Sequence, residues 1–139
     1  MTLETFSQLA ASDSEIDRII DERTKTEAEK GGVVIDAQLG AWMVKDLADV
    51  KVLIVAPDEV RFRRIAGRDG ISIQEARKQT LARESIQKQR YKKYYCIDVS
   101  DLSIYDLKID TSLYPLEKAK AVVVESVRDR LAARKLINQ

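Results

Sequence analysis

Four arginines and one aspartate are the residues of this sequence whose types and spacing best suit chemistry. Arg64 and Arg68 lie four residues apart in a segment with helical periodicity, and Arg83 and Arg90 lie seven apart in the next such segment. Residues at these spacings share one face of a helix. Asp36 ends a short apolar run that follows two glycines. Since a guanidinium group grips two phosphate oxygens at once and stays protonated, this set indicates a phosphate-binding site.

Phosphoryl transfer is the reaction that this set favours, because positioning and charge neutralisation supply most of its catalysis. The sequence contains no histidine and therefore lacks the commonest general base. A zinc site would also lack its usual ligands, and the single cysteine, Cys96, excludes an internal disulfide. We expect no metal site made by the protein alone. Solvated helix faces are the alternative explanation of the same arginines.

The composition is that of one globular domain with a strongly charged surface. Of the 139 residues, 45% are hydrophobic and 34% are charged. A chain of this length can form one hydrophobic core but is too short for two domains of ordinary size. The net charge of +1 gives no general attraction to nucleic acid or to an anionic membrane. No apolar run reaches the length of a membrane span, and the first ten residues lack the pattern of a signal peptide. We therefore expect a cytoplasmic protein.

The hydrophobic pattern predicts an α/β fold with a mainly parallel sheet. Helices are expected over residues 2–11, 12–30, 57–68, 72–95 and 115–139, strands over residues 33–36, 50–55 and 107–110, and a short helix or turn over residues 39–43. In the second helix, Ile16, Ile19 and Ile20 are expected to face the core. The charged face of that helix, which contains Asp17, is expected to be solvated.

Capping patterns mark where two of these helices begin. Ser12 with Glu15 and Ser72 with Glu75 match the capping box, and Gly70 is expected to end the helix before Ser72.

The segment over residues 72–95 has the strongest local charge imbalance, with seven basic and two acidic residues and therefore a net charge of +5. Its tyrosines, Tyr91, Tyr94 and Tyr95, could add base stacking to phosphate contacts in a nucleic-acid-binding protein. The balanced charge of the whole chain and the lack of a recognition motif argue against that class. We therefore expect no nucleic-acid partner.

Three stretches, taken in order, resemble the archaeal-type cytidylate kinases: VVIDAQLGAWM, VLIVAPDEVRFRRIAGRDGIS and RESIQKQRYKKYYCIDVSDLSIYDLKIDTS. The opening MTLETFSQLAASDSEID resembles the family segment that follows its second strand, so the likeness covers nearly the whole chain. The resemblance implies the P-loop kinase fold, which has three layers around a mainly parallel sheet. It also implies transfer of the ATP γ-phosphate to CMP or dCMP with the help of magnesium.

The resemblance further implies how a single domain over residues 1–139 is organised. A helical monophosphate-binding part over residues 1–30 is followed by core strands and a helix over residues 33–68. A lid over residues 69–100 and a closing strand with the C-terminal helix over residues 101–139 complete the chain.

The resemblance also assigns roles to the candidate residues. Arg83 and Arg90 match the catalytic lid arginines that close on the phosphates, while Arg64 and Arg68 match the basic helix that runs into the lid. Asp36 matches the acid at the end of the strand beside the monophosphate site.

Three further residues, Asp106, Thr111 and Ser112, match the closing strand of the family and the turn after it. Packing and nucleotide contact are both open as the role of these side chains.

Three positions depart from the family pattern. Ala37 and Gln38 stand where the family has Gly-Arg, whose arginine helps to hold CMP, so Gln38 becomes the candidate contact there. A neutral amide cannot replace a bidentate contact between arginine and phosphate. Cys96 stands where a glycine is usual, and an unstrained turn at that position then requires a negative φ.

The largest departure is that no G-x-x-x-x-G-K-[ST] motif occurs in these 139 residues, so nothing in them cradles the β- and γ-phosphates of ATP. The resemblance implies an incomplete sheet without the first two strands and the P-loop helix of the family. The first strand of the family lies between those matched by residues 33–36 and 50–55. We expect these two strands to close up, or an N-terminal fragment or a second copy of the chain to fill the gap.

Two functions remain open. The first is the CMP-binding and lid portion of a cytidylate kinase, and the second is a non-catalytic nucleotide-binding or assembly module derived from that family.

Overall fold

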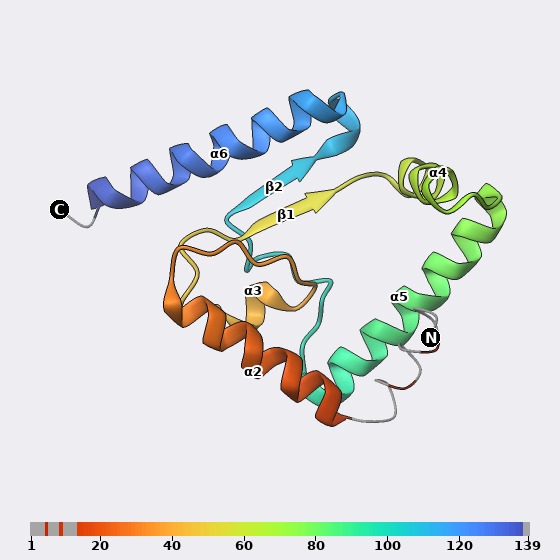
Figure 1. Cartoon of the computed structure of the whole chain (residues 1–139), viewed down its shortest axis with the longest axis horizontal. Coiled ribbons are helices and arrows are strands. Elements are labelled where there is room, and N and C mark those ends of the chain that lie inside the picture. The colour runs from red at the N-terminus through yellow and green to blue at the C-terminus, as the bar shows by residue number, and fades with distance from the viewer. Residues whose placement is uncertain (1–4, 6–8, 10–13, 138–139) are drawn as a thin grey trace.

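The computed structural model describes Thr5, Leu9 and residues 14–137. The predicted helix over residues 2–11 lies almost entirely outside this part, and the predicted cap Ser12 lies wholly outside it. The described elements, in chain order, are α2 (Ser14–Lys30), α3 (Gly40–Met43), β1 (Val52–Val55), α4 (Asp58–Asp69), α5 (Ile73–Tyr95), β2 (Leu107–Asp110), a 3₁₀ turn (Thr111–Leu113) and α6 (Leu116–Ile137) (Figure 1). The protein is thus a mixed α/β chain that is mostly helical, with a small parallel sheet.

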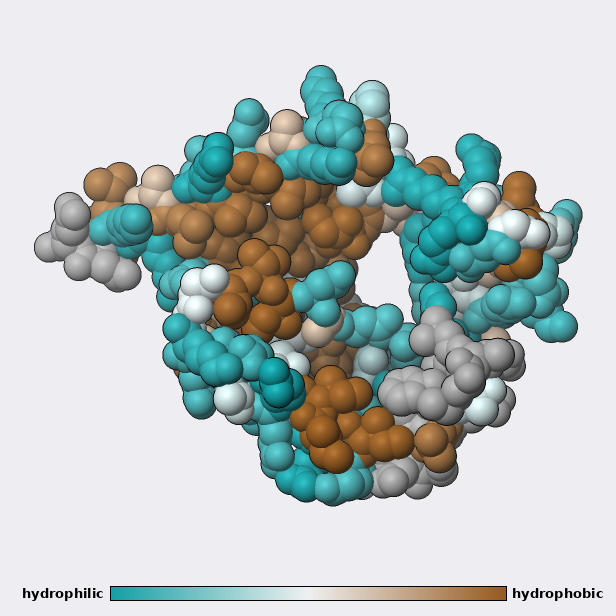
Figure 2. Space-filling model, in the orientation of Figure 1, coloured by the Kyte–Doolittle hydropathy of each residue, from teal (hydrophilic) through white to brown (hydrophobic). Residues whose placement is uncertain are grey.

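The sheet consists of β1 and β2, which run parallel with Val52 opposite Leu107 and Val55 opposite Asp110. In Figure 1 the chain leaves β1, passes through α4 and α5, and returns to β2, while α2 and α3 lie beneath the strands. Figure 2 shows an opening through the molecule between the carboxyl end of β1 and helices α4 and α5. The described part of the chain therefore forms a ring rather than a filled three-layer core.

The predicted strand over residues 33–36 is wrong. This segment is extended but pairs with no other described strand, and Val34 is 100% exposed. A strand needs a neighbour for its backbone N–H and C=O groups, and within the described residues β1 pairs with β2 alone. The expected closure between this segment and the strand at residues 50–55 is therefore absent from the described structure. The strand predicted at residues 107–110 is confirmed, and that at 50–55 is shorter by two residues.

Helix α5 begins as predicted. The hydroxyl of Ser72 accepts a hydrogen bond from the N–H of Glu75 at 3.1 Å, which satisfies one of the free donors of the first turn. Gly70 adopts a left-handed conformation with φ of 67° and ends α4, also as predicted. The buried side chains of α4 and α5, Phe62, Ala66, Ala76 and Thr80, hold these two helices together as a hairpin.

Helix α5 ends at Cys96, whose φ of 55° is in the left-handed region. The negative φ that an unstrained cysteine requires at this position is therefore not found. The N–H of Cys96 donates to the carbonyl of Lys92, and the N–H of Ile97 donates to the carbonyl of Tyr91. This is the turn that glycine usually makes after a helix, and here a residue with a Cβ makes it.

The predicted inner face of α2 is also wrong. Ile19 and Ile20 are exposed, whereas Asp17 is buried. The charged face of α2 packs toward the end of α5, where Asp17 forms an ion pair with Arg90 and Asp21 accepts a short hydrogen bond from Tyr95. Polar contacts therefore orient α2 with its charged face toward α5, although its hydrophobic pattern predicted that the isoleucine face would be buried.

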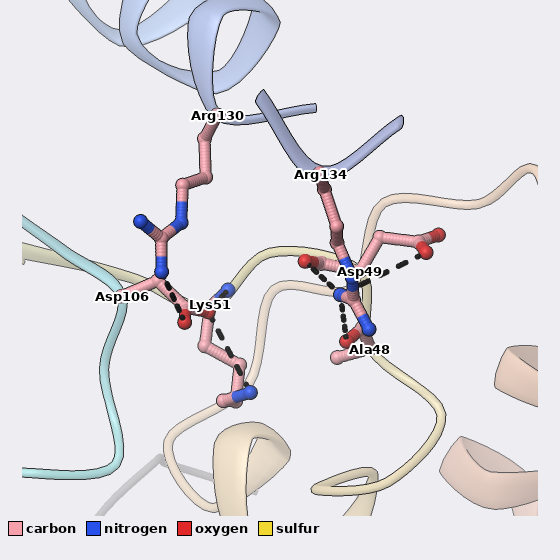
Figure 3. A network of polar contacts seen from close by, with 6 residues as sticks. All are labelled: Ala48, Asp49, Lys51, Asp106, Arg130 and Arg134. Atoms are coloured by element: carbon pink, nitrogen blue, oxygen red, sulfur yellow. Dashed lines mark hydrogen bonds and ion pairs between the residues drawn. The ribbon is translucent and has the colours of Figure 1, made fainter. Parts of the chain in front are cut away.

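A polar network fixes α6 to the amino ends of the strands (Figure 3). Asp106 accepts a hydrogen bond from the backbone N–H of Lys51 at 2.7 Å, and its carboxylate lies 3.5 Å from Arg130. Arg134 donates to the backbone carbonyls of Ala48 and Asp49. Asp106 therefore has a packing role in this structure.

Within the described part of the chain, none of the helices combines the length and the apolar character that crossing a bilayer requires.

Candidate functional site

The carboxyl ends of β1 and β2 carry the first part of the candidate site. Arg64 of α4 donates from Nη1 to the Thr111 hydroxyl at 2.7 Å and from Nη2 to the Thr111 carbonyl at 3.0 Å. The Thr111 hydroxyl in turn donates to the carbonyl of Val55 at 3.3 Å. Parallel α/β sheets bind their ligands at this edge, so Arg64 is in a position suited to an anion.

An open hollow of about 760 Å³ lies at the same edge, between the strand ends and α6. Val55, Pro57, Leu113 and Val122 contribute to its lining, together with Asp110. The Asp110 carboxylate accepts hydrogen bonds from the Ser112 side chain and backbone N–H, which lower its pKa. None of the six candidate residues lines this hollow, and Asp110 caps the 3₁₀ turn through the backbone N–H of Ser112.

Arg68 does not join Arg64. Its guanidinium lies against the neighbouring carboxylate of Asp69, with Nε 2.6 Å from Oδ1 and Nη2 2.9 Å from Oδ2. The hydrogen bond from Arg68 is the main reason why the pKa of Asp69 lies below its usual value, and the charge of Arg83 adds to the effect. Arg68 is therefore an exposed, locally paired side chain in this structure.

Arg61 lies on the same helix and connects α4 with α5. It donates to Asp58 at 2.8 Å and makes a short contact with Glu84 of α5. Carboxylates thus neutralise Arg61 and Arg68, whereas Arg64 contacts the turn after β2.

Arg83 and Arg90 share a face of α5 but have different surroundings. Arg83 is half-buried and, among the described residues, has no carboxylate within ion-pair distance. The side chain of Arg90 is only 9% exposed, and its Nε lies 3.0 Å from Oδ2 of Asp17, whose side chain is 8% exposed. Arg90 is therefore already neutralised by a carboxylate, whereas Arg83 has no ion pair within the described residues.

Gln38 contacts Tyr91, the residue that follows Arg90 in α5. Its side-chain carbonyl accepts a hydrogen bond from the Tyr91 hydroxyl at 3.0 Å, and the Arg90 guanidinium lies 5.2 Å from the centre of the Tyr91 ring. Burial raises the pKa of Tyr91, so the hydroxyl stays a donor. Asp36 is two residues away on the same exposed segment.

The structure thus distributes the predicted residues over several places instead of gathering them in one site. Gln38 bonds to Tyr91, the residue after Arg90, whereas Arg64 lies at the strand ends and Arg68 and Arg83 lie on helix surfaces.

The sequence-based prediction missed four residues of the α2–α5 junction: Asp17, Asp21, Tyr91 as a hydrogen-bond donor, and Tyr95. A signal for them exists, because the two aspartates of α2 and the two tyrosines of α5 are each four residues apart and each pair shares a helix face. Burial, together with the hydrogen bond to Asp21, raises the pKa of Tyr95.

Among the described residues, no group of three or more acidic, cysteine or histidine side chains is placed to hold a metal ion.

Comparison with known proteins identifies the relatives of this chain. The family model described as the cytidylate kinase-like family matches residues 2–113. The cytidylate kinase of Aeropyrum pernix is 46% identical over 130 residues, which cover 94% of this chain and 76% of the relative. Those of Staphylothermus marinus and Archaeoglobus fulgidus are 45% and 43% identical, over 91% of this chain and 72% and 71% of the relatives. The comparison with solved structures gave no significant match.

Proposed function

Since this chain belongs to the cytidylate kinase-like family, we propose that it supplies the monophosphate-binding part and the lid of an ATP-dependent kinase that converts CMP or dCMP to CDP or dCDP. The observation that carries the proposal is the position of Arg64 at the carboxyl ends of two parallel strands. A guanidinium at this edge neutralises phosphate charge where α/β folds hold nucleotides.

The open edge of β1 supports the proposal that the ATP side comes from outside these 139 residues. The carbonyl of Lys51 accepts from β2 and that of Val55 accepts from Thr111, so these odd-numbered residues point toward β2. Backbone groups alternate between the two edges of a parallel strand, and those of Val52 and Ile54 therefore point to the other edge. The Ile54 residue is 50% exposed there.

A further strand that ends in a G-x-x-x-x-G-K-[ST] loop can pair with this edge. In the proposal, that strand belongs to an N-terminal segment or fragment, or to a second chain in a dimer. Its loop would hold the ATP phosphates beside the opening seen in Figure 2, opposite the arginines of α4 and α5.

The roles of the side chains follow from charge and position. Arg64 and Arg83 bind phosphate oxygens, and Arg83 tightens its contact as the helix hairpin closes. Arg90 and Gln38 are beside the monophosphate, with Asp36 on the same segment. Arg68, exposed on the basic helix, contributes to attracting the anionic nucleotide.

ATP and Mg²⁺ are the expected partners of the reaction. In the proposal the ion is held mainly by the nucleotide phosphates and water, as Mg²⁺ usually is, and the described residues contain no group of three or more acidic, cysteine or histidine side chains that could hold it instead. No step of the proposal therefore runs through an ion held by this chain.

The experiment combines calorimetry with complementation. The purified chain is expected to bind CMP and to give no CDP with ATP and Mg²⁺. Addition of the part of the Aeropyrum pernix enzyme outside the matched 76% is expected to give turnover. Full turnover by the chain alone would contradict the need for an external P-loop, and failure to bind CMP would contradict the proposed function.

A non-catalytic nucleotide-binding or assembly module is the second candidate. It is favoured by Gln38, a neutral amide engaged with Tyr91 where the resemblance calls for a cation. CMP binding that persists while every complementation attempt fails would favour this candidate.

A further inference from the structure

The ion pair between Asp17 and Arg90 is the most deeply buried one in the described part of the chain. Arg90 Nε lies 3.0 Å from Asp17 Oδ2, and both side chains are less than a tenth exposed. The pair joins α2 to α5, two helices that are far apart in the sequence.

The hydrogen bonds of this pair are incomplete. Asp17 Oδ2, Arg90 Nε and Arg90 Nη1 are buried and have no hydrogen-bond partner among the described residues. The two charges are close, but the N–H of Arg90 is not aligned with the carboxylate oxygen. In a buried ion pair whose only role is structural, the donors and acceptors are normally all hydrogen-bonded. The Nε and Nη1 atoms of Arg90 thus donate no hydrogen bond within the described residues.

One other contact joins the two helices, and a second joins α5 to the segment that follows α2. Tyr95 of α5 donates a short hydrogen bond to Asp21, one turn after Asp17 on α2. Tyr91 donates to Gln38 at 3.0 Å. Arg90 can therefore change partner while the junction of α2 and α5 stays assembled.

We propose that Asp17 is a latch that withholds Arg90, and that the phosphate of the incoming nucleotide must displace Asp17 to gain this arginine. A phosphate oxygen can accept the aligned, charge-assisted hydrogen bond from Arg90 Nε that the Asp17 carboxylate does not accept here. Arg90 can thus pair with Asp17 or with the phosphate of the nucleotide, but not with both at once. This inference rests on the proposed function, since it requires a nucleotide phosphate at the junction.

The latch lowers the apparent affinity for CMP, because only the fraction of molecules with Arg90 released is competent to bind the phosphate. An amide at position 17 cannot hold the guanidinium by charge. Asp17→Asn is therefore expected to tighten CMP binding by about tenfold, within the usual range of coupling between two binding events.

The test measures CMP affinity by titration calorimetry for the wild-type chain, Asp17→Asn and Asp21→Asn. Asp21→Asn is the matched control, because it removes the same charge one turn along α2 and keeps a carbonyl acceptor for Tyr95. It is expected to change CMP affinity far less than Asp17→Asn. Equal tightening by both variants would reduce the effect to general charge removal and overturn the latch.

A second measurement on the wild-type chain covers the case in which Asp17→Asn does not fold. The Nε–H signal of Arg90 is followed by NMR during addition of CMP and is expected to shift as its partner changes. CMP binding that leaves this signal in place, or weaker binding by a folded Asp17→Asn, overturns the latch and leaves the proposed function standing. Absence of CMP binding in all three chains refutes the proposed function and the latch together.

Discussion

Arg64 holds Thr111 at two points, with its Nη1 on the hydroxyl and its Nη2 on the carbonyl, and so ties α4 to the turn that follows β2. The same hydroxyl donates to the carbonyl of Val55. One threonine therefore connects the ends of both strands with the helix that carries the candidate phosphate ligand.

Thr111→Val is expected to lower the free energy of unfolding by about 1–2 kcal/mol, because it removes two hydrogen bonds and leaves the size of the side chain nearly unchanged. Urea denaturation measures the loss. Thr26→Val is the control, since its hydroxyl bonds only to Glu22 within its own exposed helix face. Equal losses in the two variants would show that the Thr111 contacts contribute nothing specific.

Cys96→Gly is expected to stabilise the chain by about 1 kcal/mol, because glycine removes the left-handed strain at the end of α5 and gives back only part of the gain as backbone entropy. Cys96→Ala keeps the Cβ and is expected to leave stability unchanged. The urea concentrations at the unfolding midpoints of the two variants, compared with that of the wild type, measure these changes in stability. A destabilised glycine variant would mean that the αL turn carries no strain.

Acid is expected to weaken the attachment of β2 to β1 through Asp106. Partial burial alone would raise the pKa of this carboxyl, but the hydrogen bond from the Lys51 backbone and the charges of Lys51 and Arg130 together lower it. Because the folded-state pKa is lower than the unfolded one, the carboxylate stabilises the fold above the unfolded value of about 3.9. That contribution disappears as the pH falls through the folded pKa.

Asp106→Asn is accordingly expected to unfold at a lower temperature than the wild type at pH 7, and the two melting temperatures are expected to converge in the acid range. Asp129→Asn, an exposed change on α6, is the control and is expected to follow the wild type throughout. A constant difference between wild type and Asp106→Asn at all pH values would contradict this account.

Arg83→Ala is expected to lower kcat of the complemented kinase by about 10²-fold with a much smaller effect on CMP affinity, because lid contacts strengthen in the transition state. The exposed Arg77→Ala on the same helix controls for loss of general positive charge. Steady-state kinetics and CMP titration separate the two effects. Equal losses in turnover and in binding would assign Arg83 to ground-state binding instead. Arg90→Ala is expected to share this pattern, although it also leaves Asp17 buried without its partner.

Ile54→Pro is expected to abolish complementation while CMP binding by the isolated chain is retained. The N–H of Ile54 points to the open edge of β1, so proline removes a donor that β2 does not use. Leu53→Pro breaks the pairing with β2 and is expected to unfold the sheet. Turnover by complemented Ile54→Pro at the wild-type rate would show that no strand pairs with this edge.

The sequence predicted those features that depend on neighbouring residues. The Ser72 cap, the Gly70 turn and the strand at residues 107–110 are each encoded within a few positions, and each is confirmed. The family was also identifiable, because the motifs that carry it are long and ordered.

Features that depend on distant residues were not predictable in the same way. The apolar run at residues 33–36 has the composition of a strand, but a strand forms only where another one is present to pair with it. Hydrophobic periodicity placed Asp17 in solvent because it takes no account of an arginine more than seventy positions away that neutralises the charge. The same limit applies to Arg90, whose spacing from Arg83 was known but whose carboxylate partner on another helix was not.

The attachment of α5 at one end has a mechanical consequence. Asp21 and Gln38 hold the last turns of this helix through Tyr95 and Tyr91, whereas its first turn joins α4 at the far side of the opening. Counted from Tyr91, the start of the helix lies roughly 27 Å away and Arg83 roughly 12 Å away, so a rotation of about 10° there would move the α4–α5 corner by about 5 Å and Arg83 by about 2 Å. A rotation of the α4–α5 hairpin about its attachment near Gln38 would therefore move α4 much further than Arg83, the arginine that binds the phosphate in the proposed function.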